Sequence, residues 1–317
     1  MALVIDSLCK RFGAVQALDG ISFVAQPGQV FGFLGPNGAG KTTTMRIALD
    51  IVHADAGSVT WAGRPAAEAP RRTWGYLPEE RGLYPRMKVL DQLVFVAALH
   101  GLARREAADL ARHWLARFRI PDYADRRAEQ LSKGNQQKVQ FIGAILHDPD
   151  VLLMDEPFSG LDPINAALLK EAFLELRDRG KALVFSTHQM EAVEELCDSI
   201  AIIDHGRLVL SGPVPTVKRQ ADRVVVRLGV AGDRALDWLD ALPNATVRRP
   251  GLDYHEVELR DGADPQMILQ AALARHAYVT RFEIAPPSIE DIFIDRVGIG
   301  TLNTERTLGT AGVEATR

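Results

Sequence analysis

Short runs of apolar residues recur along the first two thirds of the chain, and stretches with helical spacing separate them. The runs cover residues 30–34, 151–154, 182–185 and 200–203. Runs that are apolar at every position are typical of parallel strands buried on both faces. Because a helical pattern such as residues 165–179 lies between them, we predict an α/β domain with a parallel sheet over residues 1–211.

Residues 86 to about 145 differ from this pattern. They are rich in helix formers and contain no run of the buried-strand type. We therefore predict a helical subdomain inserted into the sheet domain.

The remainder of the chain predicts a second, smaller unit. The turn Ser211-Gly212-Pro213 opens a polar segment, so we expect a linker over residues 212–222. Strand patterns at 224–228, 256–259 and 278–284, with helical patterns at 234–242, 265–276 and 286–297, predict a small α+β domain over residues 223–297. We expect Ser288 to cap the last helix with Glu290 behind it. Residues 298–317 are polar and rich in Gly and Thr, and we expect disorder there.

Composition narrows the class of protein. The chain has 317 residues, 47% of them hydrophobic and 25% charged, which is ordinary for a soluble globular protein of roughly two domains. The net charge of −4 implies no general attraction to nucleic acid. The two cysteines, Cys9 and Cys197, form no C-x-x-C pair, which favours a reducing compartment. We expect neither a secretory signal nor a membrane-spanning segment, because no long apolar run occurs.

A phosphate-binding loop follows the first apolar run. Residues 35–42 spell G-x-x-x-x-G-K-T, the P-loop pattern, between a predicted strand and a predicted helix. Its glycines let the backbone N–H groups approach a phosphate, and the helix dipole adds positive potential. Lys41 carries a charge for the β- and γ-phosphates, and the Thr42 hydroxyl is suited to Mg²⁺. The predicted nucleotide-binding residues are Gly35, Pro36, Asn37, Gly38, Ala39, Gly40, Lys41, Thr42 and Thr43.

Two carboxylates end the second apolar run. In a nucleoside triphosphatase one carboxylate holds the Mg²⁺ shell and the next polarises the attacking water. We predict that Asp155 does the first and that Glu156 is the general base. The P-loop, this pair and His188 each follow an apolar run directly. Because ligands bind at the carboxyl ends of such strands, all three could face one crevice.

A second anion site is predicted at residues 131–138, L-S-K-G-N-Q-Q-K, which precede a helical pattern. Ser132 is a good N-cap, and the N–H groups beside it are free to bind an anion. Taken alone, however, this segment indicates no more than a helix start.

The order of these motifs is informative. P-loop, then Leu131-Ser132-Lys133-Gly134-Asn135, then Asp155-Glu156, then Ser159-Gly160-Leu161-Asp162 and finally His188 resembles the ATP-binding subunit of ABC transporters. The resemblance covers residues 1 to about 211. Residues 287–293, P-S-I-E-D-I-F, are similar to the closing helix of the C-terminal appendage in the exporter-type branch.

The resemblance implies roles at matching positions. It implies ATP and Mg²⁺ as ligands, with adenine stacked on Phe12. Ser132 and Gly134, with Asn135 in the same site, would contact the γ-phosphate held by the P-loop of a second subunit. Asp162 would signal across that subunit interface. His188 would act in catalysis by contacting the γ-phosphate and the attacking water.

Two departures from the family pattern stand out. Glu79 occupies a position where the family usually has Gln; it still offers an oxygen to Mg²⁺ but adds a negative charge, so we expect altered rather than abolished metal affinity. The predicted metal-binding residues are therefore Thr42, Glu79 and Asp155. Lys133 and Asn135 replace Gly and Gln of the usual signature. Lys133 either adds a cation near the phosphate or points to solvent, whereas Gly134 preserves the close backbone approach.

The resemblance predicts an ATP-hydrolysing subunit that powers a membrane exporter. Two copies would enclose ATP in a two-fold symmetric dimer at the cytoplasmic face of the membrane, with no nucleic acid partner. A separate polytopic permease would dock near the helical insert and residues 79–85, where Leu83, Tyr84 and Pro85 offer an apolar hook. One alternative is a soluble ABC-type ATPase acting on ribosomes or DNA. Another is a nucleotide switch without turnover, against which Glu156 and His188 argue.

Overall fold

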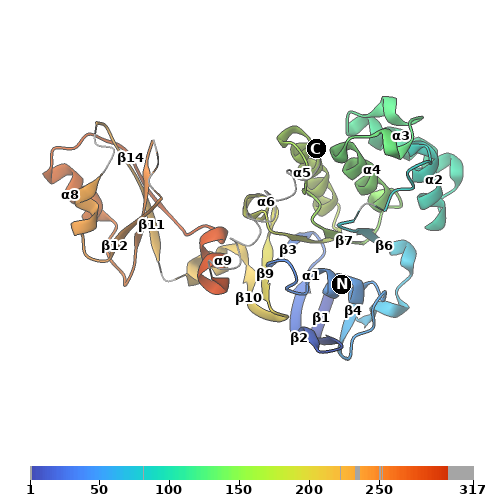
Figure 1. Cartoon of the computed structure of the whole chain (residues 1–317), viewed down its shortest axis with the longest axis horizontal. Helices are drawn as coiled ribbons and strands as arrows, with labels where there is room; N and C mark the ends of the chain where they lie inside the picture. Colours follow the sequence, from blue (N-terminus) through green and yellow to red (C-terminus); the bar gives the residue numbers. More distant parts are fainter. Residues whose placement is uncertain are drawn as a thin grey trace, which may run out of the picture. The chain divides into compact units, whose positions relative to one another are not determined.

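The computed structural model describes residues 2–80, 82–221, 223–232, 236–249, 251 and 253–298. The chain divides into two compact units that meet in sequence at Val214 and Pro215 (Figure 1). The expected disordered tail, residues 298–317, lies outside the described residues except for Gly298.

The central sheet of the first unit has six strands in the order β10-β9-β3-β8-β7-β6. They are β3 (Gln29–Leu34), β6 (Trp74–Leu77), β7 (Val151–Asp155), β8 (Ala182–Thr187), β9 (Ser199–Asp204) and β10 (Arg207–Pro213). All neighbours pair in parallel except β10, which is antiparallel to β9. Every residue of β7 and β8 is buried. The predicted α/β class is confirmed, and the order brings the ends of β3, β7 and β8 to one edge.

A second, antiparallel sheet in this unit has the order β2-β1-β4-β5. Its strands are β1 (Leu3–Phe12), β2 (Val15–Ala25), β4 (Ala56–Trp61) and β5 (Arg64–Pro65). Phe23 of β2 stacks on Phe31 of β3, with ring centres 4.8 Å apart. Helix α1 (Lys41–Ala48) belongs to the same hydrophobic core through Met45 and Ile47.

Helices fill the segment predicted as a helical insert. They are α2 (Val89–Leu99), α3 (Arg104–Arg117) and α4 (Lys133–Ile145), with short 3₁₀ turns η3 (Pro121–Tyr123) and η4 (Ala128–Gln130). Figure 1 shows α2, α3 and α4 grouped together. Aromatic rings join them to α5 (Pro163–Asp178): Phe118 contacts Phe141, and Phe141 stacks on Phe173 at 5.8 Å. The unit also contains η1 (Ala66–Glu68), η2 (Arg71–Thr73) and α6 (Met190–Leu196).

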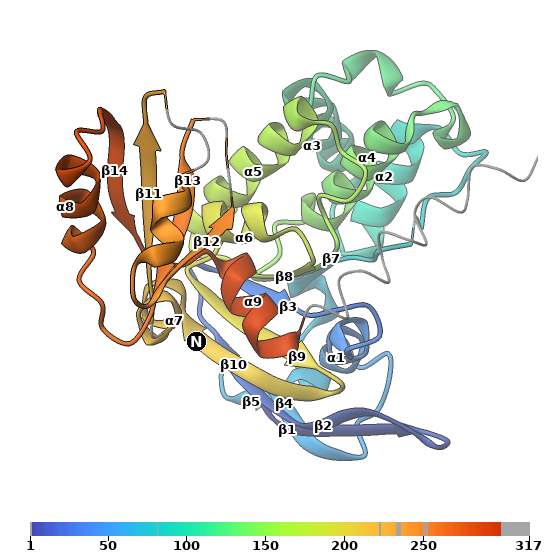
Figure 2. The same cartoon turned by 60° about the vertical axis from the view of Figure 1, so that its left-hand side comes forward.

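The segment expected to be a linker includes the end of β10 and helix α7 (Val214–Gln220). The second unit follows with β11 (Val224–Val230), η5 (Asp237–Ala241), β12 (Ala245–Arg249), β13 (His255–Leu259), α8 (Gln266–Ala274), β14 (Val279–Ala285) and α9 (Ile289–Val297). Its antiparallel sheet has the order β12-β13-β11-β14, visible in Figure 2. This order is that of a ferredoxin-like fold. The helix expected at 234–242 is a 3₁₀ helix in the described residues, and β12 was not predicted.

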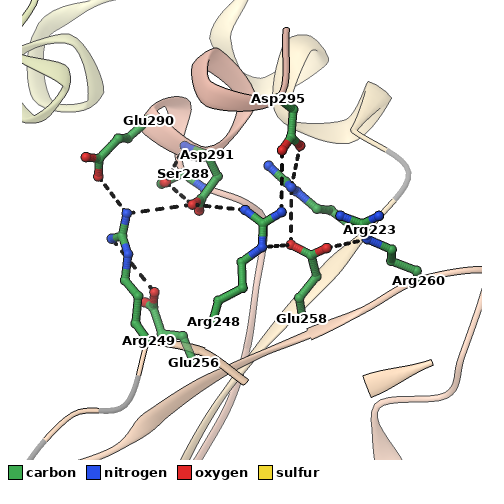
Figure 3. Close-up of polar contacts among 10 residues, drawn as sticks. All are labelled: Arg223, Arg248, Arg249, Glu256, Glu258, Arg260, Ser288, Glu290, Asp291 and Asp295. Carbon is green, nitrogen blue, oxygen red and sulfur yellow. Dashed lines mark hydrogen bonds and ion pairs between the residues drawn. The ribbon is translucent and has the colours of Figure 1, made fainter. Parts of the chain in front are cut away.

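Charged side chains attach α9 to this sheet (Figure 3). Glu258 of β13 is 2% exposed and accepts contacts from Arg223 at 3.2 Å, Arg248 at 2.5 Å and Arg260 at 2.5 Å. Arg223 and Arg248 also contact Asp295 of α9. The sheet and the last helix are thus joined through shared arginines.

Ser288 caps α9, as predicted: its Oγ accepts from the N–H of Asp291 at 3.0 Å. The acidic partner predicted for it is wrong, however. Asp291 rather than Glu290 reaches back to the Ser288 N–H, because it occupies the third helical position that a capping box requires. Glu290 instead pairs with Arg249 at 2.7 Å.

Candidate nucleotide site

The loop between β3 and α1 has the tight geometry that the sequence predicts. Gly40 adopts φ +112°, and a Cβ there would lie 2.7 Å from the Ala17 carbonyl oxygen. At Gly35 a Cβ would lie 2.3 Å from the carbonyl oxygen of Ile203. Side chains cannot be accommodated at either position, so the backbone N–H groups remain accessible to a phosphate.

Two side chains at the start of α1 are already directed at this loop and at β7. The Lys41 ammonium donates to the carbonyl oxygens of Gly35 at 2.7 Å and Pro36 at 3.1 Å. The Thr42 hydroxyl donates to Oδ2 of Asp155 at 2.5 Å. Thr42 and Asp155 therefore present adjacent hard oxygen atoms of the kind that Mg²⁺ prefers.

Glu156 lies at the end of β7 with its carboxylate in a network of polar groups. It is 5% exposed and has φ +50°, and its N–H donates to the Ser186 carbonyl oxygen at 3.1 Å. The Thr187 hydroxyl donates to Oε2 at 3.2 Å, and Nδ1 of His188 lies 2.9 Å from Oε1. Ser186 also donates to Asp155. β8 and the residue after it thus orient both carboxylates.

Glu79 belongs to the same group of acids. Burial raises its pKa, and the charges of Asp155 and Glu156 raise it further. Together with Lys41 and Thr42 these carboxylates line a cavity of about 400 Å³. The adjacent oxygen atoms of Thr42 and Asp155 suit a divalent cation, and the adjoining loop fits the phosphates that such a cation accompanies.

The cavity has further walls that the sequence analysis missed. Val15, Gln16 and Ala17 of β2 line it, and so does His205 in the turn after β9. For Val15, Gln16 and Ala17 the only signal in the sequence is that they lie close to Phe12 in the chain. For His205 it is the His-Gly turn that follows an apolar run. Phe12 is not among the lining residues; its side chain is 48% exposed, with the Lys10 ammonium 5.4 Å from the ring centre.

The signature segment lies elsewhere in the same unit. Ser132 caps α4 by accepting from the N–H of Asn135 at 3.3 Å, and Lys133 is exposed in the first turn. Asp162 caps α5, and the N–H of Asn165 lowers its pKa. None of these residues lines the P-loop cavity. The structure thus gathers Lys41, Thr42, Glu79, Asp155, Glu156 and His188 together and leaves the signature residues apart.

A second cavity, of about 450 Å³, lies between the sheet and the helices. Leu83 and Tyr84 form part of its wall, together with Leu93 and Val96 of α2. Tyr84 is 56% exposed and packs edge-on against Phe95 at 6.2 Å. The other residues that line this second cavity include His100 and His147.

A parallel sheet with a phosphate loop, a Thr–Asp pair and an oriented glutamate defines a P-loop nucleoside triphosphatase. Comparison of the sequence with protein-family models identifies one family within this class. A model of the family described as ABC transporter matches residues 18–159, and one described as ATP-binding protein DrrA1-3-like, C-terminal domain, matches residues 212–297. The chain belongs to the ATP-binding proteins of ABC transporters, a family whose ATP-binding domain hydrolyses ATP.

Curated relatives and solved structures agree with this assignment. The chain is 44% identical over 296 residues to the uncharacterized ABC transporter ATP-binding protein YhaQ of Bacillus subtilis (strain 168), covering 93% of this chain and 98% of the relative. It is 39% identical over 211 residues to Nod factor export ATP-binding protein I of Burkholderia thailandensis, covering 66% and 69%. A solved ATP-binding subunit of an ABC transporter superposes with a TM-score of 0.65 at 30% identity, covering 69% of this chain and 93% of that one.

Within the part of the chain that the structure describes, no helix combines the length and apolar character needed to cross a bilayer. In this family the ATP-binding subunits work with membrane permease components and form dimers.

Proposed function

We propose that this chain drives export across a membrane by binding and hydrolysing ATP between two copies of itself. The main support for the proposal is that the predicted site residues fall into two separate groups in one copy of the chain. The phosphate loop and the carboxylates line one cavity and His188 contacts Glu156, whereas Ser132, Gly134, Asn135 and Asp162 lie outside that cavity. A capped helix start that does not line the phosphate cavity of its own copy suits a phosphate held by a second copy, as an isologous interface requires.

Within one copy the residues divide the chemistry. The loop amides from Gly35 to Thr43 and the Lys41 ammonium would hold the phosphates, and Thr42, Asp155 and Glu79 would hold Mg²⁺. When bound, Mg²⁺ supplies charge that neutralises the β- and γ-phosphate oxygens. Glu156 accepts a proton from the water that attacks the γ-phosphorus, the bond to the β-phosphate oxygen breaks, and ADP and phosphate leave.

His188 has a positioning role in this scheme. Its Nδ1 lies 2.9 Å from Oε1 of Glu156, so the ring holds the carboxylate of the proposed general base in place. Phe12, exposed at the end of β1, provides a face on which adenine stacks. Loss of the γ-phosphate contact then releases the partner copy, so binding and hydrolysis alternate two conformations.

The membrane partner is a separate polytopic permease, and the chain works at the cytoplasmic face. The cavity walled by Leu83, Tyr84 and α2 supports this choice, because most of its lining residues are apolar and the Tyr84 side chain is 56% exposed. Such a groove suits a short helix of the permease. The direction of transport rests on the match to the Nod factor export ATP-binding protein and on the C-terminal domain.

The test is capture of the partner from native membranes. The Glu156→Gln variant with ATP is used as bait on solubilised membranes, and Lys41→Ala serves as the control that binds no nucleotide. We expect a polytopic membrane protein in stoichiometric yield with the first bait only. Recovery of ribosomal or DNA-associated proteins without a membrane protein would replace the transport function by that of a soluble ABC-type ATPase.

A further inference from the structure

We propose that His205 is a nucleotide-contacting residue whose imidazole makes a polar contact with the ribose and α-phosphate part of bound ATP or ADP. This inference rests on the proposed binding of ATP in the P-loop cavity. His205 carries none of the roles assigned above, and it lies in a turn between two strands rather than in a recognised motif.

Its position is the first argument. His205 lines the same cavity as the P-loop residues Asn37, Gly38 and Gly40. Val15, Gln16 and Ala17 of β2, the strand that follows Phe12 in the chain, line the same cavity. A nucleotide with its phosphates on the P-loop and its adenine on Phe12 would carry its ribose and α-phosphate along the part of the cavity that His205 and β2 line.

The turn that carries His205 is bonded to the P-loop and to β2. The Gly206 N–H donates to the Ala39 carbonyl oxygen at 3.0 Å, and the Asp19 N–H donates to the Gly206 carbonyl oxygen at 2.8 Å. A Cβ at Gly206 would lie 2.7 Å from the Ala17 carbonyl oxygen. The backbone of His205 is therefore positioned by the P-loop itself, as a binding residue requires.

The orientation of the ring is the second argument. Nδ1 of His205 lies 2.8 Å from Oδ1 of Asp204, whose side chain is 21% exposed. With Nδ1 beside this carboxylate, Nε2 is the ring atom left for another partner. The other charges next to the turn, Arg207 and Asp19, pair with each other at 2.7 Å. The ring itself is 84% exposed, so a ligand reaches it without rearrangement.

The backbone conformation decides how the residue is tested. His205 has φ +45°, where glycine is comfortable and an alanine would add strain. His205→Gly therefore removes the imidazole and keeps the turn, and His205→Gln keeps a polar group of similar reach. His53→Gly is the matched control: His53 is 89% exposed, its Nδ1 lies 3.3 Å from Asp50, and it is not among the residues lining the cavity.

The measurement is the dissociation constant of ATP and of ADP, each with Mg²⁺, for the full chain and these variants. We expect His205→Gly to weaken both nucleotides by the same factor, about threefold to tenfold, because a partly solvated hydrogen bond to a ligand is lost. We expect His205→Gln to recover most of the affinity and His53→Gly to match the wild type.

Equal affinities of His205→Gly and wild type would overturn the inference. A loss confined to ATP would also overturn it, because the contact would then be with the γ-phosphate. Failure of the wild type to bind either nucleotide would instead refute the proposed function. Lys41→Ala separates the cases, since it removes the central phosphate contact and leaves His205 in place.

Discussion

Glu79 adds a negative charge to the nucleotide cavity at a position where the family usually has Gln. Its carboxyl group shares a cavity with Asp155 and Glu156, and burial with their negative charge raises its pKa. A third acid in this place has a physical consequence: it strengthens attraction for a divalent cation and repels phosphate when the cation is absent.

Replacing Glu79 by Gln should therefore raise the Mg²⁺ concentration needed for half-maximal ATP hydrolysis by about tenfold. Affinity for ATP without Mg²⁺ should rise in the same variant, because one negative charge has been removed. Titration of ATPase activity with Mg²⁺ checks the first effect and nucleotide binding in EDTA the second. An unchanged Mg²⁺ requirement would remove Glu79 from the metal site.

His147 is a buried titratable group outside the nucleotide site. Its Nε2 lies 3.0 Å from the Trp74 carbonyl oxygen, and its ring stacks on His100 with centres 3.7 Å apart. Burial, and then the neighbouring His100, lower the pKa of His147 to about 4. In the unfolded chain a histidine has a pKa of about 6.5. Between these values the unfolded state binds a proton that the folded state does not.

The free energy of unfolding should consequently fall as the pH is lowered from about 6.5 toward 4, with about 3 kcal/mol due to His147. The contribution is complete above the unfolded pKa. Urea denaturation across this pH range should show a shallower loss for His147→Gln than for the wild type, whereas exposed His53→Gln should follow the wild type. Equal slopes for all three proteins would contradict the buried neutral state.

At the scale of elements, the strands that the sequence predicts in the first unit are those buried on both faces. β3, β7, β8 and β9 appear as uninterrupted apolar runs, so their burial can be seen in any window of sequence. The sheet of β1, β2 and β4 was missed because its strands mix buried and exposed positions. The β1–β2 register also shifts between Ile5 and Leu8, which breaks simple alternation.

Helix α9 shows which features of an element can be predicted from the sequence. Its start is predictable because a cap is local chemistry, but its attachment is not. Glu258, Arg248 and Asp295 come from separate segments and meet only in the folded unit (Figure 3). A carboxylate that is 2% exposed among arginines cannot be identified from a strand pattern in which it shares a face with the polar residues Glu256 and Arg260.

Removing that carboxylate should destabilise the second unit. Glu258→Gln leaves Arg223, whose side chain is 4% exposed, without its buried partner, a change that costs about 3–5 kcal/mol. Hydrogen exchange of β13 and α9 in the full chain should accelerate strongly, with little change in the first unit. Glu290→Gln is the control, because its pair with Arg249 is about half exposed and worth under about 1 kcal/mol. Equal exchange in both variants would refute this role of Glu258.

At the scale of the whole molecule, the sequence predicts those site residues that belong to local motifs. The P-loop, Asp155-Glu156 and His188 each follow a strand, and parallel strands end at a common edge. His205 and residues 15–17 reach the same cavity only because β2 and the β9–β10 turn pack against the P-loop. Tertiary contacts of this kind leave no spacing pattern in the sequence.

The cavity walled by Leu83, Tyr84 and α2 yields a prediction about assembly with the membrane partner. Tyr84→Asp places a charge in the wall of this apolar cavity and should greatly reduce capture of that partner. ATP binding should be unaffected, since Tyr84 is not among the residues lining the nucleotide cavity. Tyr278→Asp, at a residue 75% exposed in the second unit, is the matched control in the same pull-down. Full capture by Tyr84→Asp would exclude this groove as the docking site.

The central claim is that ATP joins two copies and that Glu156 ends the joined state. Sedimentation velocity of the Glu156→Gln variant with Mg²⁺ and ATP, paired with phosphate release, tests it most directly. We predict a dimer with ATP, a monomer with ADP, and hydrolysis slowed by about 10²–10⁴-fold relative to the wild type. A monomer at saturating ATP, or hydrolysis at the wild-type rate, would contradict the account.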